Sequence, residues 1–167
     1  LDGRTVTPGL ADNHYHGIGG GPGVDLSNVR TMDELIAAIL SRADETAAGE
    51  LILTNSNWHE GQLAEQRLPL RDDLDKASRK HPIVVVRGGH QLMLNSAALE
   101  KWDITPSTQV PEGGRVGRYE SGRLNGELVD RAKDLVQLPK RASFPFEERV
   151  DALEREFREL NLSLIHI

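Results

Sequence analysis

Cysteine is absent from the sequence, and long apolar runs are absent as well. Without thiols, disulfide scaffolds and thiolate metal sites are excluded, so a bound metal has to be held by imidazole, carboxylate or water. No apolar run approaches the roughly 20 residues of a membrane-spanning helix, so we expect no membrane partner. The first four residues are polar and lack the apolar core of a signal peptide. We expect a cytoplasmic protein whose true start is missing, since residue 1 is leucine.

Basic charge is also in the minority, with 20 Lys and Arg against 26 Asp and Glu and a net charge of -6. The sequence therefore lacks the basic footprint of a nucleic-acid-binding domain, and we expect no nucleic-acid partner. Its composition, 38% hydrophobic and 28% charged, is that of a soluble domain with one core. Six histidines and many carboxylates leave metal chemistry open.

Short helices and short strands alternate along the chain, which predicts the α/β class. A helix is expected to start at Thr31, where Glu34 completes a capping-box pattern, and to stop at Gly49. The continuous apolar run at residues 83–86 favours a strand covered on both faces. Further strands are expected at residues 5–16 and 51–54 and twice within 111–128, and further helices at residues 71–78, 95–102 and 143–161.

The predicted strand at residues 5–16 carries the clearest candidate site. Because side chains two apart on a strand point the same way, Asp12, His14 and His16 share one face. Two imidazoles at the end of a strand can both reach one cation at roughly 2.0–2.1 Å. Imidazole suits zinc, iron, cobalt or nickel, and an added carboxylate would admit manganese. Asp12 could ligate the metal, or it could accept a hydrogen bond from one of the histidines.

Two other interpretations of this region were open. A bare His-x-His pair also occurs by chance, and a strand histidine is more often a hydrogen-bonded core or surface residue than a ligand. The glycine-rich loop at residues 17–23 resembles a phosphate loop only in composition. It lacks the Lys-Ser/Thr pair of a P-loop and the strand–helix setting of a dinucleotide fingerprint, so phosphate binding is rejected.

The residues around the histidine pair extend the pattern. Residues 6–16 resemble the first barrel strand of the metal-dependent amidohydrolase superfamily. The pattern of that strand is an apolar residue, Pro-Gly, two small or apolar residues and then Asp-x-His-x-His. The sequence matches it at Pro8, Gly9, Asp12, His14 and His16. Residues 70–100 look like the YtcJ-like branch of that superfamily, which includes N-substituted formamide deformylases. The matching positions in this second stretch are Asp73-Leu74-Asp75, His81-Pro82, Arg87, His90 and Asn95-Ser96-Ala97-Ala98-Leu99, together with Trp58 and the glycine-rich residues 122–129.

The resemblance implies a (β/α)8 TIM barrel, with its active site at the C-terminal ends of the barrel strands. Residues 1–23 would form the first barrel strand and the metal-site loop, and residues 24–142 a large inserted α/β lobe. Residues 143–161 would be the helix that returns to the barrel. Residues 162–167 continue no pattern and are read as a truncation or a non-native tail. The barrel in this chain would be partial and incomplete.

The resemblance also implies which ligands this chain supplies. His14 and His16 would bind the metal, with Asp12 behind them, and we expect a divalent ion, zinc first and manganese or iron as alternatives. In the family, a carboxylated lysine or other bridging acid, two more histidines and an aspartate come from later strands. That aspartate is the usual general base, so the catalytic base is expected beyond this chain.

Polar and aromatic residues that follow the buried strands are the remaining candidates. His90 is assigned to substrate contact, with a structural role as the alternative. Trp58 could line the same pocket, although a tryptophan at a strand end is more often simply packed. Arg87 could bind a substrate carboxylate, but a surface ion pair is favoured. His59 and His81 are read as structural or solvent-facing.

The resemblance of the two stretches implies a metal-dependent hydrolase that acts on carbon–nitrogen bonds other than peptide bonds in small amide-type substrates. Two alternatives stay open. The chain could be a catalytically incomplete fragment that exposes apolar faces, or the scaffold could hydrolyse another ester or ring substrate.

Overall fold

The computed structural model of the protein describes residues 3, 21, 23–139 and 146–162. The chain divides into two compact units, residues 1–18 with 139–167 and residues 19–138. The strand expected at residues 5–16, the first three residues of the helix expected at residues 143–161 and the tail from residue 163 lie outside the described residues. None of the described helices is long and apolar enough to cross a membrane.

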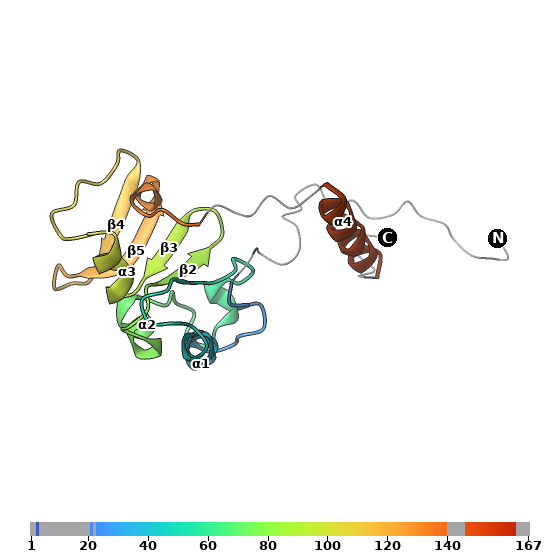
Figure 1. The fold of residues 1–167 in the computed structure, drawn as a ribbon, viewed down its shortest axis with the longest axis horizontal. Coiled ribbons are helices and arrows are strands. Elements are labelled where there is room, and N and C mark those ends of the chain that lie inside the picture. Colours follow the sequence, from blue (N-terminus) through green and yellow to red (C-terminus); the bar gives the residue numbers. More distant parts are fainter. Residues whose placement is uncertain (1–2, 4–20, 22, 140–145, 163–167) are drawn as a thin grey trace. The chain divides into compact units, whose positions relative to one another are not determined.

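A five-stranded open sheet forms the centre of the larger unit (Figure 1). Its strands follow the order β1-β2-β3-β5-β4, in which β1 runs parallel to β2 and the other neighbours are antiparallel. The protein is therefore a mixed α/β structure, as the alternating pattern predicted. The strand bounds are β1 Ile52–Leu53, β2 Ile83–Arg87, β3 Gln91–Leu94, β4 Gly114–Arg118 and β5 Leu124–Asp130.

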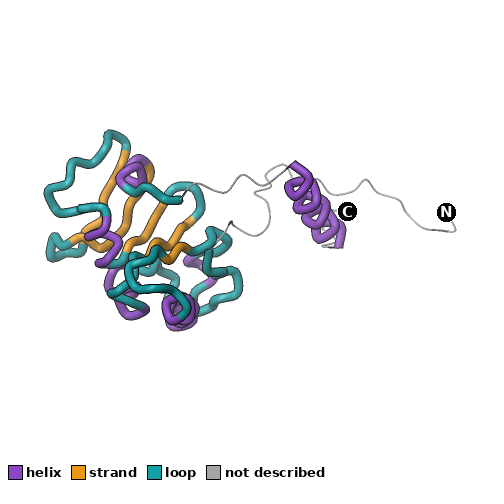
Figure 2. Tube along the Cα trace, viewed as in Figure 1, coloured by secondary structure: helices purple, strands orange, loops and turns teal. Residues whose placement is uncertain are grey.

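Each face of the sheet packs into its own apolar cluster. In β2, Ile83 and Val85 join the first cluster with α1 and α2, and Val84 joins the second with α3. All three side chains are fully buried, which confirms the prediction of a strand covered on both faces. Figure 2 shows the helices and loops around the orange strands. The helices of this unit are α1 Met32–Asp44, α2 Arg71–Ala77 and α3 Ser96–Lys101, with short 3-10 turns η1 Glu60–Gln62 and η2 Arg131–Leu135.

Helix α1 confirms the predicted start and corrects the predicted stop. The Thr31 hydroxyl accepts the Glu34 amide at 3.1 Å, which is half of the expected capping box. The Glu34 carboxylate instead accepts the amide of Arg30 at 2.6 Å. The helix ends at Asp44, five residues before Gly49. Gly49 has a φ of +87° and donates its amide to Lys80, so it shapes the turn that leads to β1.

Helix α4 spans Phe146–Leu162 and is the described element of the smaller unit. The helix was predicted at residues 143–161 from its apolar stripe, and the structure confirms it. Phe146, Leu153 and Phe157 are exposed large apolar side chains on this helix.

Candidate functional site

Candidate residues that the sequence analysis named after the buried strands lie at one edge of the sheet. Because β1, β2 and β5 run in the same direction, their C-terminal ends meet at this edge, where β3 and β4 begin. We call it the polar edge and define it by residues that follow or end these strands. They are Trp58, His59, Glu60, Arg87, His90 and Asp130. The carboxyl ends of strands are where α/β sheets commonly bind ligands.

Trp58 is the member of the polar edge whose side chain is packed in the interior. It is 6% exposed and belongs to the first apolar cluster. Its indole N–H donates to the backbone oxygen of Val86 at 2.8 Å, so its polar atom is used within the protein. These contacts join the loop after β1 to the end of β2 and agree with the packing alternative for Trp58. Its part in substrate binding stays a prediction.

Arg87 forms the ion pair that the sequence favoured. Its guanidinium donates two hydrogen bonds to the Glu60 carboxylate, at 2.6 and 2.8 Å. The hydrogen bond from Arg87 lowers the pKa of Glu60 and outweighs the opposing effect of burial. A third contact, at 2.8 Å, joins Arg87 to Nε2 of His59. Through these contacts Arg87 holds the loop after β1, in agreement with the ion-pair interpretation.

His90 stands at the turn between β2 and β3 and is largely exposed, with 81% of its side chain accessible. Its Nδ1 lies 2.9 Å from a carboxylate oxygen of Asp130, the last residue of β5. The Asp130 amide also donates to the backbone oxygen of His90 at 2.8 Å. The histidine assigned to substrate contact is therefore accessible to a ligand and is fixed to a carboxylate. Its contact with substrate stays a prediction.

A buried carboxylate, Glu127, lies next to the polar edge. Its side chain is 11% exposed and pairs with Arg115 at 3.0 Å. Gln91, the first residue of β3, donates to it at 3.0 Å. Every buried side-chain nitrogen and oxygen among the described residues has a hydrogen-bond partner. Glu127 is therefore a satisfied structural group, and it offers no open acceptor.

The predicted metal ligands His14 and His16, and Asp12 behind them, lie outside the described residues. Within the part of the chain that the structure describes, no three His, Asp or Glu side chains come close enough together to hold a metal ion. The described residues alone thus do not fit a metal, and the metal assignment rests on the sequence pattern.

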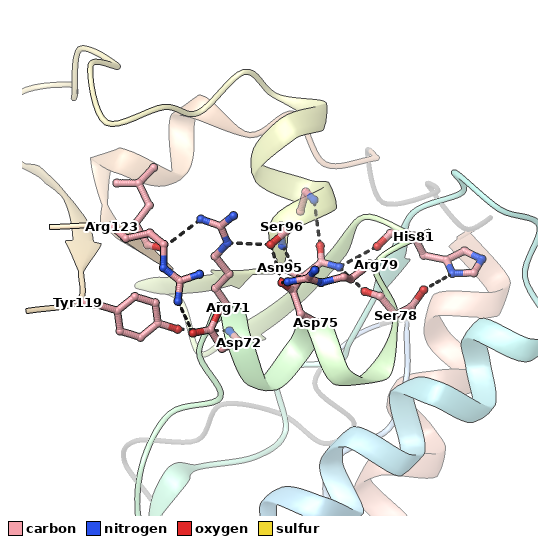
Figure 3. A network of polar contacts seen from close by, with 12 residues as sticks. Arg71, Asp72, Asp75, Ser78, Arg79, His81, Asn95, Ser96, Tyr119 and Arg123 are labelled. Carbon is pink, nitrogen blue, oxygen red and sulfur yellow. Dashed lines mark hydrogen bonds and ion pairs between the residues drawn. The ribbon is translucent and has the colours of Figure 1, made fainter. Parts of the chain in front are cut away.

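The motif residues of the 70–100 stretch form a polar network between helices and strands (Figure 3). Asp75 of α2 accepts both the amide and the hydroxyl of Ser96, the first residue of α3. Asn95 is fully buried and bonds four backbone groups in three segments. His81 contacts the Ser78 hydroxyl at 2.8 Å and the Thr46 carbonyl at 3.1 Å, which confirms its structural role. This stretch therefore links the helices and strands of the larger unit.

Sequence reasoning did not find Glu60, Glu127 or Asp130. Glu60 and Glu127 lie among many acidic residues and carry no motif. Asp130 is the last residue of β5, and His90 comes shortly after the end of β2. A polar residue at the end of a strand is a signal that the sequence did contain. The pairing of Asp130 with His90 depends on β3 lying between β2 and β5, and β3 was not predicted.

Comparison with known proteins identifies the family. The family model described as "Amidohydrolase family" matches residues 1–165, so the chain belongs to the amidohydrolase family. It is 33% identical over 93% of its length to Protein LONG AFTER FAR-RED 3 of Arabidopsis thaliana. It is 30% identical over 81% to the putative amidohydrolase YtcJ of Bacillus subtilis, and 31% identical over 81% to an N-substituted formamide deformylase of Arthrobacter pascens. The predicted branch is confirmed.

These matches cover only part of each relative. The chain accounts for 27%, 26% and 26% of their respective lengths, so it spans about a quarter of the curated relatives that it matches.

Proposed function

We propose that this chain is part of a metal-dependent hydrolase that acts on carbon–nitrogen bonds other than peptide bonds in small amide-type substrates. The observation that carries the proposal is membership of the amidohydrolase family over residues 1–165, a range that includes the Asp12-x-His14-x-His16 pattern. A relative named N-substituted formamide deformylase suggests secondary formamides as the first substrates to try.

In this proposal His14 and His16 bind a divalent ion, with zinc expected first and manganese or iron as alternatives. Asp12 accepts a hydrogen bond from one of the two imidazoles and so fixes its ring orientation. A bound divalent ion would lower the pKa of its water towards about 7 and polarise the scissile carbonyl. The general base and the other ligands would come from residues beyond this chain.

The proposed architecture is a TIM barrel that this chain enters through residues 1–23. Residues 24–142, which contain the described sheet, would be the inserted lobe, and α4 would return the chain to the barrel. His90 would then contact the substrate from the lobe, and Trp58 would line the same pocket. The exposure of the His90 side chain supports its proposed role.

Hydrolysis by a family-length protein that carries these 167 residues tests the proposal. We expect release of formate from a secondary formamide, and loss of that activity in the His14→Ala and His16→Ala variants. The control is Glu120→Ala, because Glu120 is an exposed residue of the turn between β4 and β5, at the opposite end of these strands from the polar edge. A wild-type protein that cleaves the corresponding formate ester but no amide would favour the ester alternative instead.

The 167-residue chain by itself is a second case, for which we propose no activity. The described residues form no metal-binding group, and the chain spans about a quarter of its relatives. Formamide hydrolysis by the purified chain at the rate of the family-length protein would contradict this.

A further inference from the structure

Asp130 has a backbone conformation that is costly for any residue other than glycine. Its φ is 50° and its ψ is -119°, which lies outside the left-handed helical region that aspartate can visit. Such a conformation persists only where the surrounding structure enforces it, and it concentrates at functional positions. The strain at Asp130 therefore calls for an explanation.

Helix capping does not explain the aspartate. Asp130 occupies the N-cap position of η2, yet its side chain makes no capping hydrogen bond there. The carboxylate instead reaches 2.9 Å to Nδ1 of His90, across the strand order from β5 to the β2–β3 turn. Both side chains are open to solvent, at 53% and 81% exposure, so this pair adds little to the stability of the fold.

The pair does determine how the imidazole presents itself. A carboxylate can only accept at Nδ1, so in a neutral ring the proton sits on Nδ1 and Nε2 keeps its lone pair. Among the described residues, Asp130 is the hydrogen-bond partner of this ring, and none contacts Nε2. The result is a fixed, accessible hydrogen-bond acceptor at the polar edge.

The two nearby cations of η2, Lys133 and Arg131, each contact an acceptor other than the His90 imidazole. The Lys133 ammonium, from η2, contacts the backbone oxygen of Gly89 beside His90. Arg131 is paired with Asp134 at 2.8 Å within η2. Both cations are therefore directed away from the imidazole and towards other acceptors.

We propose that Asp130 is a positioning residue that holds His90 in the Nδ1–H tautomer, so that Nε2 accepts the N–H of an amide substrate. The recognition step rests on the proposed amidohydrolase function, whereas the tautomer does not. The ligand class is an amide that retains an N–H, such as a secondary formamide, because a tertiary amide has no hydrogen to donate to this nitrogen. Asp130 acts through His90 and does not itself touch the substrate.

The first test measures the tautomer in the 167-residue chain, without any substrate. We expect the nitrogen-15 NMR spectrum, recorded at a pH at which the ring is neutral, to show His90 protonated at Nδ1 and unprotonated at Nε2. In Asp130→Gly the preference for Nδ1–H should be lost, while Asp130→Asn, which keeps an acceptor oxygen, should retain part of it. A neutral wild-type ring that carries its proton on Nε2 would overturn the proposal.

Asp130→Gly also separates positioning from a merely structural role. Glycine adopts φ +50° without steric cost, so the variant removes the carboxylate and relieves the backbone at the same time. We expect its denaturation midpoint to be equal to or above that of wild type. A structural aspartate would instead lower the midpoint on replacement and leave substrate recognition unchanged.

The second test uses the family-length protein with a secondary formamide and the tertiary formamide that lacks the N–H. We expect Asp130→Gly to raise KM for the secondary formamide about three- to tenfold, the value of one net hydrogen bond, with kcat little changed. KM for the tertiary substrate should not move. His90→Asn has an amide that can still donate to Asp130, but the shorter side chain places no acceptor at the position of Nε2, so this variant should behave like Asp130→Gly. His90→Gln, whose amide oxygen can reach that position, should recover part of the affinity.

The outcomes separate the two proposals. An unchanged KM in Asp130→Gly, in a protein that hydrolyses formamides, overturns the role of Asp130 and leaves the hydrolase intact. A wild-type protein that cleaves no amide refutes the hydrolase and the substrate part of this inference together, and the NMR result alone then decides whether Asp130 fixes the ring.

Discussion

Replacing Asn95 by alanine should destabilise the larger unit, residues 19–138, more than any other single polar substitution in the α2–α3 region. The side chain of Asn95 is fully buried, and its oxygen accepts the amides of Ile83 and Ala98, both at 2.9 Å. Its nitrogen donates to the carbonyls of Ser78 and His81 at 2.8 and 2.9 Å. The amide group thus uses its whole hydrogen-bonding capacity, and it joins β2, the N-terminus of α3 and the loop after α2.

The magnitude follows from these four bonds. Loss of the helix cap at Ala98 costs about 1 kcal/mol. Each of the other three buried backbone groups loses its partner at about 1 kcal/mol, so the expected loss is about 4 kcal/mol. That is a large share of the roughly 5–15 kcal/mol by which domains are stable.

Urea unfolding of the 167-residue chain, followed by tryptophan fluorescence, measures the effect. Buried Trp58 reports on the first apolar cluster. The matched control is Asn57→Ala, which truncates an exposed asparagine and should change the free energy of unfolding by less than about 0.5 kcal/mol. A loss below about 1 kcal/mol in Asn95→Ala, or one equal to the control, would show that the four-bond reasoning is wrong.

Four other substitutions, one of them a control, test the packing and electrostatics of the larger unit by the same assay. Leu128→Ala should cost about 2–5 kcal/mol, because its side chain is fully buried in the second apolar cluster; a cost below 1 kcal/mol would contradict the packing. Gly126→Ala should be far more harmful than Gly122→Ala, since both have positive φ but only a Cβ at Gly126 would overlap a neighbouring carbonyl. Burial of Asp73 opposes its ionisation, but hydrogen bonds from Arg67 and a backbone amide outweigh this and lower its pKa. The stabilisation is therefore present above the ordinary Asp value of about 4 and is lost as the pH falls through the lowered pKa. Arg67→Met should flatten that acid loss, and an unchanged pH profile would refute the assignment.

The elements that the sequence predicted correctly are those whose signals are local. The hydroxyl of Thr31 caps the helix that follows it, and the aliphatic run at 83–86 is buried on both faces. Both features depend on neighbours in sequence. The predicted helix end at Gly49 failed because a positive-φ glycine marks any tight turn, and here the turn belongs to the approach to β1.

Strand β3 was missed because its identity is set by pairing and not by propensity. Gln91-Leu92-Met93-Leu94 contains no β-branched residue, and leucine and methionine favour helices as isolated segments. The Gly88-Gly89 turn folds it back antiparallel to β2, with Val85 opposite Met93. Tertiary pairing thus overrides the local preference.

The same limit applies to the candidate site. Motif spacing suggested His90, but its partner Asp130 lies 40 residues away, and only the strand order brings the two together. The motif residues Asp75 and Asn95 were attached to a family pattern without a physical role. The structure assigns them that role as buried cross-links between α2, β2 and α3.

Metal content is the most direct test of whether His14 and His16 hold a catalytic ion. Elemental analysis of the family-length protein after exhaustive dialysis should find a divalent metal in the wild type and in Glu120→Ala. The double variant His14→Ala/His16→Ala should have lost it. Equal metal in the double variant and the wild type would contradict the assignment of these two ligands.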